Sequence, residues 1–391
     1  RNRVNQPHHI TPPRRVALLM DHGFAYNRLA LRGIYEHVVG NADWIMHQAN
    51  PEPRNLPALR EWAPDGVIGH ITDPEFAEGL VSWGGPVVST TSALGTDLFP
   101  VVDVDHFAAG RLGAEHFLEH GHVAFAFFGS ATTGFSIERE HGFRERIESA
   151  GHTVLSCHAD PLLSRHRDES WIRTEEEIER WLLQLPRPCG IFVSNDVSAR
   201  TVTNAANQLG LRIPEELSIL SVDNDEFECL FTTPTLSSIE IPAVQIGRAA
   251  ARILQQKLEG DITESGTLLP PVQVIERQST DLVATKDHAV VKAVSYIRAN
   301  LTEQISVDDI ADAAQCSRRT LERRFREALD RTVHDELTRQ RLARARRLLQ
   351  ETDMPLEKLA KQTGFMDSRR LGLVFKKRFA TTPAAFRRSL H

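Results

Sequence analysis

Between Arg15 and about residue 280, short apolar runs alternate with stretches whose apolar residues recur at helical spacing. Runs such as Val16–Met20 and Ser218–Val222 are typical of buried strands. Further strands are expected at 66–69, 87–89, 123–128, 153–157 and 190–194, and helices at 26–39, 106–119, 137–150, 175–184, 197–209 and 244–258. The alternation predicts parallel sheets covered by helices, and its length favours two α/β lobes with a cleft between them.

The last hundred or so residues show only helical spacing and contain two similar units, at about 305–326 and 354–378. Each predicts a short helix, a tight turn and a second helix that carries basic residues, which is a helix-turn-helix. Ser317 is an expected N-cap of the first such second helix, and 333–351 is expected to be a long helix that joins the units. Outward positions suited to DNA are Arg318, Arg319, Glu322, Arg323, Ser368, Arg369 and Arg370, with Lys376 and Lys377 suited to phosphates.

Charge separates this segment from the rest of the chain. The whole chain has 46 Lys and Arg against 52 Asp and Glu. Residues 288–391 contain 22 basic and 13 acidic residues, whereas residues 1–287 contain 24 and 39. A basic module on an acidic body is typical of a nucleic-acid reader joined to another domain, although a solvated Arg-rich helical face is the alternative.

Length and composition set further limits. A chain of 391 residues predicts two or three domains, here a lead-in at 1–14, an α/β domain at 15–281 and a helical domain at 282–391. No apolar run reaches the length of a membrane span, and the polar lead-in lacks the apolar core of a signal peptide. Cys157, Cys189, Cys229 and Cys316 lie far apart, which favours reduced thiols and a cytoplasmic location.

His116 and His120 have the i, i+4 spacing of a metal-binding pair. No third ligand is evident nearby in the sequence. We therefore expect histidines on a helix surface, with no metal site and no cofactor.

Polar residues follow several of the predicted strands. Asp21 follows the first strand, Asn195 and Asp196 follow the strand at 190–194, and Asp223 and Asn224 follow Val222. The carboxyl ends of strands in open α/β sheets line the ligand crevice, and carboxylates and amides suit a ligand rich in hydroxyls. The alternative is that these residues cap helices or form turns.

Several segments of this body resemble the LacI-type, periplasmic-binding-protein-like sensor domains. They include the stretches at 105–122, 139–143, 190–197, 217–226 and 236–250. The resemblance implies that Arg139 and Asp223 contact a sugar, that Asn195 and Asp196 also line the cleft, and that Asp21 and Arg28 are ligand or cleft residues. Arg139 supplies a fixed fork of donors, and Asp223 is an acceptor for adjacent hydroxyls.

The C-terminal segment resembles the AraC/XylS-type DNA-binding domain. The matching positions are Ala311, Ser317, Leu321, Phe325, Ala345, Leu349, Ala360, Gly364, Phe365, Phe375, Lys376, Lys377, Pro383 and Arg387. Asp330 and Ala380 stand where that family usually has glycine after each recognition helix. Arg369, Arg370 and Leu371 replace its usual Ser-Tyr-Phe, so the second reader is unusually basic.

A LacI-like sensor before an AraC-type reader, bridged by residues 270–281, resembles the family of xylose operon regulators. This implies a cytoplasmic homodimer that activates genes with RNA polymerase when D-xylose binds the cleft and changes engagement of a double-stranded DNA operator. A regulator of another sugar remains an alternative. An enzyme acting on a small carbohydrate is another, but nucleophile-elbow, P-loop and G-x-G-x-x-G motifs are missing. A periplasmic binding protein is disfavoured by the basic segment.

Overall fold

A computed structural model describes residues 12–95, 97–159, 171–261, 266–281, 285, 287–352, 354–379 and 381–388, without the side chains of 171–174, 347, 350 and 351. Most of the expected lead-in, and Ala380, lie outside the described residues. The chain forms two compact units, one of Arg1–Leu118 and Val123–Leu282, the other of Glu119–His122 and Val283–His391. We call them the sensor unit and the helical unit. Among the described residues, no helix is long and apolar enough to cross a membrane.

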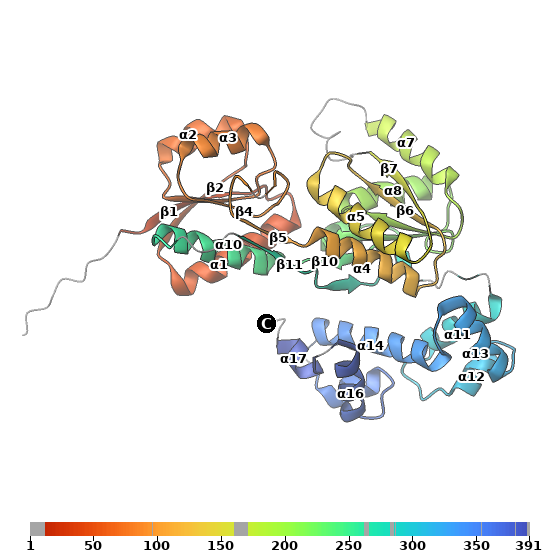
Figure 1. The fold of residues 1–391 in the computed structure, drawn as a ribbon. Helices are drawn as coiled ribbons and strands as arrows, with labels where there is room; N and C mark the ends of the chain where they lie inside the picture. Colours follow the sequence, from red (N-terminus) through yellow and green to blue (C-terminus); the bar gives the residue numbers. More distant parts are fainter. Residues whose placement is uncertain are drawn as a thin grey trace, which may run out of the picture. The chain divides into compact units, whose positions relative to one another are not determined.

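The first lobe of the sensor unit is built on a parallel six-stranded sheet in the order β11-β5-β4-β3-β1-β2 (Figure 1). Its strands are β1 (Arg14–Leu19), β2 (Trp44–Ala49), β3 (Gly66–Gly69), β4 (Val87–Ser89), β5 (Val101–Val104) and β11 (Gly266–Leu269). The helices of this lobe are α1 (Ala25–Asn41), η1 (Pro53–Asn55), α2 (Leu56–Trp62), α3 (Pro74–Trp83) and α10 (Ala243–Leu258). Buried side chains of β1 and β3 face helices on both sides, as their continuous apolar runs predict.

The second lobe has its own six-stranded sheet, in the order β12-β10-β9-β8-β6-β7. Its strands are β6 (Phe125–Gly129), β7 (Val154–His158), β8 (Cys189–Val193), β9 (Leu217–Asp223), β10 (Ser237–Glu240) and β12 (Gln273–Ile275). Its helices are α4 (His106–Glu119), α5 (Gly134–Ser149), α7 (Trp171–Gln184), α8 (Asp196–Gln208), α9 (Glu226–Leu230) and η2 (Gln278–Thr280). The pairing of β10 with β12 is antiparallel and the others are parallel.

The chain passes between the two lobes three times, from β5 to α4, from β10 to α10 and from β11 to β12. The predicted two-lobed α/β fold is therefore confirmed. Residues 270–281 do not simply bridge to the next domain, because they supply β12 and η2, and Ser279 is fully buried.

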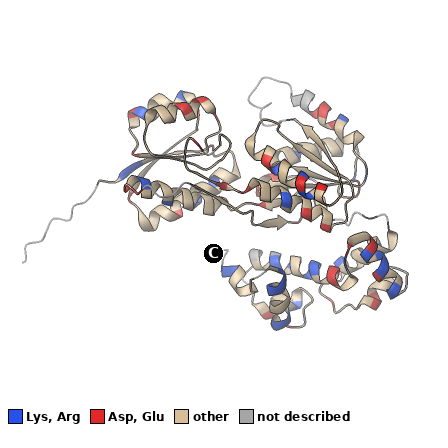
Figure 2. Cartoon of the chain, in the orientation of Figure 1, with Lys and Arg blue, Asp and Glu red and all other residues tan. Residues whose placement is uncertain are grey.

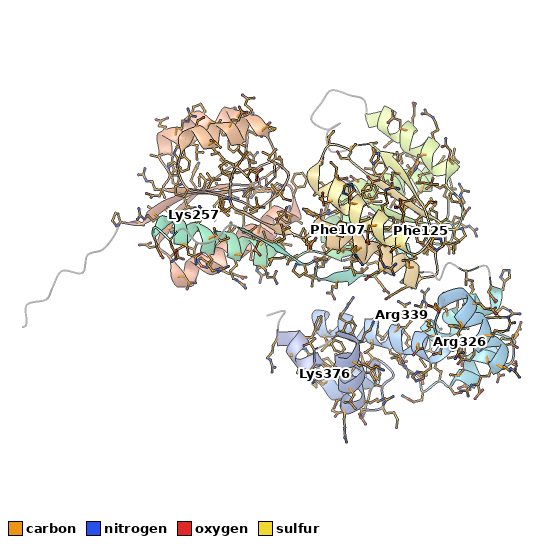
Figure 3. All side chains as sticks on the ribbon, viewed as in Figure 1. Phe107, Phe125, Lys257, Arg326, Arg339 and Lys376 are labelled. Atoms are coloured by element: carbon orange, nitrogen blue, oxygen red, sulfur yellow. The ribbon has the colours of Figure 1, made fainter. Side chains whose placement is uncertain are left out.

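Glycines allow two pairs of helices in the sensor unit to pack backbone against backbone. A Cβ at Gly33 of α1 would lie 1.9 Å from the carbonyl oxygen of Val244 in α10. A Cβ at Gly142 of α5 would lie 2.0 Å from the carbonyl oxygen of Phe107, which Figure 3 labels at the start of α4. No side chain larger than glycine fits at such separations, so these residues fix how closely the helices approach.

The helical unit contains α11 (His288–Ala299), α12 (Val307–Ala313), α13 (Arg318–Leu329), α14 (Val333–Glu351), α15 (Leu356–Gln362), α16 (Ser368–Phe379) and α17 (Pro383–Arg388). Two apolar cores are present, and α14 contributes to both. The first surrounds Leu321 and Phe325, and the second surrounds Leu371 and Phe375, all of which are fully buried. One long helix therefore holds two small helical bundles, as the apolar periodicity predicts.

A buried charged cluster fixes the first half of α14. Glu336 is fully buried, and its carboxylate lies 2.8 Å from Arg331 Nε and 3.0 Å from Arg339 Nη2. The Gln340 amide also donates to Glu336 Oε1 at 2.6 Å. Burial raises the pKa of Glu336, but the two guanidinium groups and Gln340 outweigh it and hold that pKa at about 2.

Candidate functional sites

Arg139 on α5 is the centre of a buried polar group at the strand ends of the second lobe. Its side chain is 3% exposed, Nη1 donates to the Ser194 carbonyl, and Nη2 lies 3.1 Å from Asp223 Oδ1. Nε lies 3.3 Å from His106 Nδ1, and the guanidinium carbon lies 5.0 Å from the centre of the Phe135 ring. Arg139 and Asp223, predicted from separate segments, are thus brought together in the geometry of a charge-assisted pair.

Asp223 and Asn224 form the turn that ends β9. Both have left-handed backbone conformations, with φ of 111° and 52°, which orients the Asp223 carboxylate toward Arg139. Burial raises the pKa of Asp223, although Arg139 opposes that change. Asn224 is held differently, because its Oδ1 accepts from Arg277 Nη2 at 2.7 Å.

Asn195 and Asp196 are both buried. Asn195 Oδ1 accepts from Ser198 N at 2.9 Å and caps α8, which was the alternative interpretation. Asp196 accepts from Ser238 Oγ at 2.6 Å and from Asp225 N at 2.7 Å. Burial and the nearby Asp223 carboxylate raise the pKa of Asp196. Asp196 therefore helps to shape the loop that carries Asp223, whereas Asn195 caps its own helix.

Residues of the first lobe reach the same region. Asp21 Oδ1 accepts from Gly23 N at 2.8 Å in the loop after β1. Arg28 Nη2 lies 3.9 Å from Asp225 Oδ2 and joins the two lobes. Tyr26 donates to the Thr90 carbonyl at 2.5 Å, and burial together with the Asp103 and Asp223 carboxylates raises its pKa well above the usual value. Donors and acceptors from both sheets thus converge at the strand ends.

His116 and His120 are buried, so the expectation of histidines on a helix surface is wrong. His116 stacks edge-on against Phe117 and its Nδ1 lies 3.8 Å from Glu276 Oε1. Glu276 lies 160 positions along the chain from His116. The i, i+4 spacing of the two histidines therefore could not reveal this acidic neighbour.

The first helix-turn-helix consists of α12 and α13. Ser317 caps α13 by accepting from Thr320 N at 3.3 Å, which confirms the predicted N-cap. Of the predicted DNA-facing residues here, Arg318, Arg319 and Arg323 are exposed. Glu322 is half-buried, and its Oε2 accepts from Val333 N at 3.4 Å, so this carboxylate meets the start of α14.

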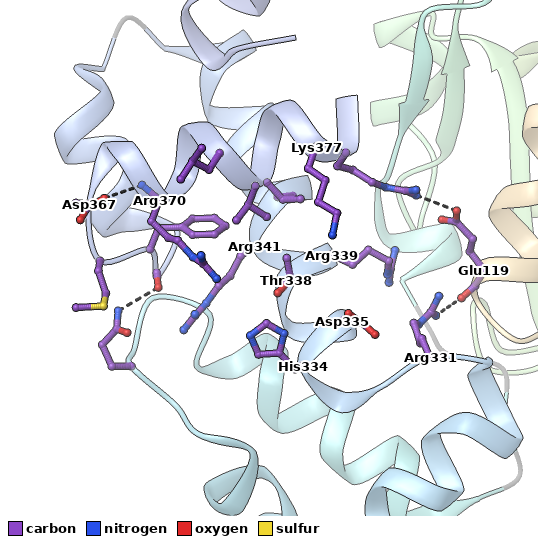
Figure 4. Close-up of a pocket in the computed structure, with 18 residues that line it drawn as sticks. Glu119, Arg331, His334, Asp335, Thr338, Arg339, Arg341, Asp367, Arg370 and Lys377 are labelled. Atoms are coloured by element: carbon purple, nitrogen blue, oxygen red, sulfur yellow. Dashed lines mark hydrogen bonds and ion pairs between the residues drawn. The ribbon is translucent and has the colours of Figure 1, made fainter. Parts of the chain in front are cut away.

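The second helix-turn-helix consists of α15 and α16, joined by a turn in which Gly364 has a φ of 73°. Asp367 Oδ1 accepts from Arg370 N at 2.6 Å at the start of α16, as the dashed line in Figure 4 shows. Ser368 is half-buried and donates to Glu357 Oε1 at 2.6 Å. Exposed basic residues follow on α16, namely Arg369, Arg370, Lys376 and Lys377.

Figure 2 shows Lys and Arg distributed along the helices of the helical unit, including α13, α14 and α16. Electrostatic attraction to phosphates dominates protein–DNA affinity, and two helix-turn-helix units present exposed guanidinium and ammonium groups on their second helices. This geometry suits duplex DNA.

Comparison with known proteins agrees with both units. Residues 114–280 match the periplasmic binding protein-like domain family, and residues 310–389 match a helix-turn-helix domain family. The xylose operon regulatory protein of Escherichia coli K12 is 29% identical over 97% of this chain and 98% of its own length. That of Haemophilus influenzae is 28% identical over 95% and 98%. A solved structure titled as the xylose-binding transcription activator xylR covers 96% of this chain and 98% of its own, with 28% identity and a TM-score of 0.62.

The chain thus resembles the xylose operon regulatory proteins over nearly its whole length. It combines a periplasmic-binding-protein-like sensor with an AraC-type helix-turn-helix domain, and it binds DNA through that domain. It is accordingly a transcription regulator rather than an enzyme. The polar cluster around Arg139 therefore has to be understood as part of a sensor.

Asp330, which stands where the AraC-type pattern usually has glycine, adopts the backbone conformation that the glycine would give. Asp330 ends α13 with a φ of 51°, the left-handed conformation that glycine adopts most easily. The backbone thus keeps the shape that the usual glycine would give, and aspartate is among the residues that tolerate it.

Asp103 and His106 are the residues of the cluster that sequence reasoning missed. Asp103 lies in β5 and is 2% exposed, and its Oδ2 lies 3.1 Å from His106 Nε2. The available signal was a carboxylate inside an otherwise apolar strand, Val101–Val104, because a buried acid requires a partner.

Proposed function

We propose that this regulator senses a small sugar with the Arg139–Asp223 pair and adjusts its engagement of a DNA operator accordingly. The observation that carries the proposal is the buried guanidinium of Arg139, held 3.1 Å from Asp223 at the strand ends of a sensor fold. Such a pair offers a fork of donors beside an acceptor, which suits neighbouring hydroxyls of a sugar. Arg28, Asp21 and Tyr26 bring further polar groups from the other lobe.

D-xylose is the proposed effector. This proposal is supported by the Escherichia coli and Haemophilus influenzae relatives, which are named xylose operon regulatory proteins and align with this chain over nearly their whole lengths. The cluster itself selects polar, hydroxyl-rich ligands, and another pentose or a hexose is the alternative that a ligand panel tests.

The proposed mechanism is closure of the two lobes around the sugar. The three chain crossings between the sheets are the segments that can bend, while the sheets move as packed bodies. In a cytoplasmic homodimer, closure would change how the two helical units are presented to the operator. Binding of D-xylose would then favour the state that recruits RNA polymerase and activates transcription.

The proposed DNA contacts fall into two classes. Arg318, Arg319 and Arg323 on α13, together with Ser368, Arg369 and Arg370 on α16, are proposed to face the grooves. Glu322 accepts from Val333 N through Oε2, and its other carboxylate oxygen is proposed to contact DNA from the same face. Lys376 and Lys377 are proposed to contact phosphates. Exposure of the basic members of both sets supports contact with DNA, and the place of Lys376 and Lys377 in the last turn of α16 supports their separate role at phosphates.

The decisive experiment is titration calorimetry of the full chain with D-xylose and a panel of other pentoses and hexoses. Wild-type protein is expected to bind D-xylose, and Arg139→Ala and Asp223→Ala are expected to lose binding while keeping DNA affinity without sugar. Each lost charge-assisted bond is worth about 1.5–3 kcal/mol. Arg212→Ala is a matched control, because Arg212 is a surface residue paired with Glu216. Unchanged D-xylose affinity in both variants would contradict the proposed site.

A further inference from the structure

A continuous series of polar contacts joins the sheet of the first lobe to the sugar-facing pair of the second. Asp103 Oδ2 in β5 lies 3.1 Å from His106 Nε2, and His106 Nδ1 lies 3.3 Å from Arg139 Nε. The exposed fractions of Asp103, His106 and Arg139 are 2%, 7% and 3%. His106 begins α4, directly after the first crossing between the lobes, so it is placed where the lobes bend.

The chemistry of the two neighbours determines where the proton of His106 lies. A guanidinium Nε can only donate, so His106 Nδ1 must be the acceptor and carry no proton. The proton is then on Nε2 and is donated to Asp103. Asp103 Oδ2 also accepts from Ser92 N at 2.7 Å and from Ser92 Oγ at 2.9 Å. Burial raises the pKa of Asp103, but the bonds from His106 and Ser92 hold it below its usual range, so this acceptor stays ionised.

We propose that His106 is a positioning residue whose neutral imidazole, with its proton on Nε2, holds Arg139 against Asp223, and that charging this ring weakens sugar binding in acid. The proposal rests on the proposed sugar-sensing function. It adds a regulation of the same site, in which effector affinity depends on pH through a residue that does not itself form the sugar-facing pair.

The groups that face the His106 ring explain the direction of the effect. Asp103 faces it from β5, Arg139 and Phe135 from α5, Asp223 from the end of β9, and His70 from the segment after β3. A proton on Nδ1 would point at the Arg139 Nε–H and place a second positive charge beside the guanidinium. The contact would then be repulsive, and Arg139 could keep its bonds to Ser194 and Asp223 only by moving away from His106.

The first test compares the pH profile of D-xylose affinity in the full chain between about pH 8 and about pH 5.5, the range in which histidine changes charge. His106→Ala is expected to weaken binding roughly tenfold at pH 8, because Arg139 loses a buried acceptor. His106→Gln supplies an amide oxygen and an N–H without titration. It is expected to recover most of that loss, and its D-xylose affinity is expected to depend less on pH than that of the wild type.

Controls separate this effect from other titrations. Asp196 and Asp223 are kept in every variant, and the NMR measurement below observes the His106 ring separately from these carboxylates. His141→Gln changes an exposed histidine of α5, with a side chain that is 65% exposed, and is expected to reproduce the wild-type profile. Thermal melting confirms that each variant is folded. An acid profile of His106→Gln that matches the wild type would overturn the proposal, as would wild-type affinity in a folded His106→Ala.

A second test does not depend on any sugar. Nitrogen NMR of the full chain labelled with ¹⁵N-histidine distinguishes the two neutral tautomers and the charged ring, and the His106 signals are those that disappear in His106→Gln. A neutral ring protonated on Nε2 near pH 7.5 is expected. A ring protonated on Nδ1, or a charged ring, would overturn the proposal. If the wild type bound none of the pentoses or hexoses in the panel, the sugar-sensing function would fail, while this measurement would still decide the state of His106.

Discussion

Gly110 of α4 lies directly against the backbone of Arg139, and a Cβ on Gly110 would be 2.1 Å from the Arg139 carbonyl oxygen. The position of the Arg139 side chain therefore depends on how closely α4 and α5 approach. The same approach brings His106, one turn before Gly110, to within 3.3 Å of Arg139.

Gly110→Ala is accordingly expected to separate α4 from α5 and damage the sensor. Overpacking of this kind lowers the free energy of unfolding by about 1–3 kcal/mol. D-xylose affinity should also fall, because Arg139 would shift away from Asp223. Thermal melting and calorimetry measure the two effects. Gly40→Ala is the matched control, because a Cβ there meets no atom within 4 Å. A Gly110→Ala protein with unchanged melting and affinity would contradict the proposed role of this contact.

The buried Glu336 cluster is expected to make the helical unit sensitive to acid. The pKa of Glu336 is about 2 in the folded state against 4.5 ordinarily, so the folded state favours the ionised form. Its stabilisation, about 3 kcal/mol, is present above about pH 4.5 and is lost as the pH falls toward 2.

Hydrogen exchange of peptides from α13 and α14 in the full chain measures this stabilisation. Glu336→Gln should reduce protection strongly at pH 7, and the difference from wild type should shrink toward pH 3, where exchange remains measurable. Glu327→Gln is the control, since Glu327 forms only an exposed pair with Arg323, which contributes little. Equal protection of wild type and Glu336→Gln at pH 7 would show that the cluster does not stabilise α14.

Arg323→Ala is expected to affect sequence recognition. If Arg323 reaches a base edge, its loss should cost about 1–3 kcal/mol on the cognate operator and relax the preference at one base pair. Binding titrations on cognate and singly substituted duplexes measure this. Arg212→Ala changes an exposed basic residue of the sensor unit and serves as the control. A uniform loss across all duplexes would remove Arg323 from the base-reading set.

Lys377→Ala is expected to act differently. Loss of one phosphate contact should weaken binding to all sequences about equally and reduce the slope of log affinity against log salt by about 1. Titrations at several salt concentrations, on cognate and scrambled duplexes, provide the measurement. A changed sequence preference in Lys377→Ala would place this residue at a base instead.

The regulator is expected to form a homodimer, because sensors of this fold commonly pair side by side. Sedimentation at micromolar concentration, with and without D-xylose and DNA, tests the prediction. A monomer under all these conditions would exclude it, and the proposed change of dimer geometry with it.

The sequence predicted much of the fold because buried parallel strands and amphipathic helices have different apolar periods. α4 and α14 were anticipated at their observed ends, His106–Glu119 and Val333–Glu351. β2 was missed because it is an edge strand whose short apolar run, Trp44–Met46, is followed by polar residues and is largely exposed. β11 and β12 were missed because they pair with strands distant in sequence, β5 and β10, which the apolar pattern did not predict either.

The candidate site was predictable only where a residue's role follows from its own segment. Asp223 and Arg139 were identified from strand-end position and family resemblance, and the structure pairs them. The inward hydrogen bonds of Asp196 were not predictable, because its partners Ser221, Ser238 and Asp225 come from other segments. His106 was missed for the same reason, since its contacts with Asp103 and Arg139 depend on tertiary packing.

The single helix α14 has a consequence for the orientation of the regulator on its operator. Its 19 residues span about 28 Å, close to the roughly 34 Å that separates successive major-groove segments on one side of the duplex. The two readers it joins differ in sequence, so the pair has no twofold symmetry. An operator for one chain is therefore not a palindrome but has a defined direction, and inverting it would turn the bound protein end for end relative to the promoter.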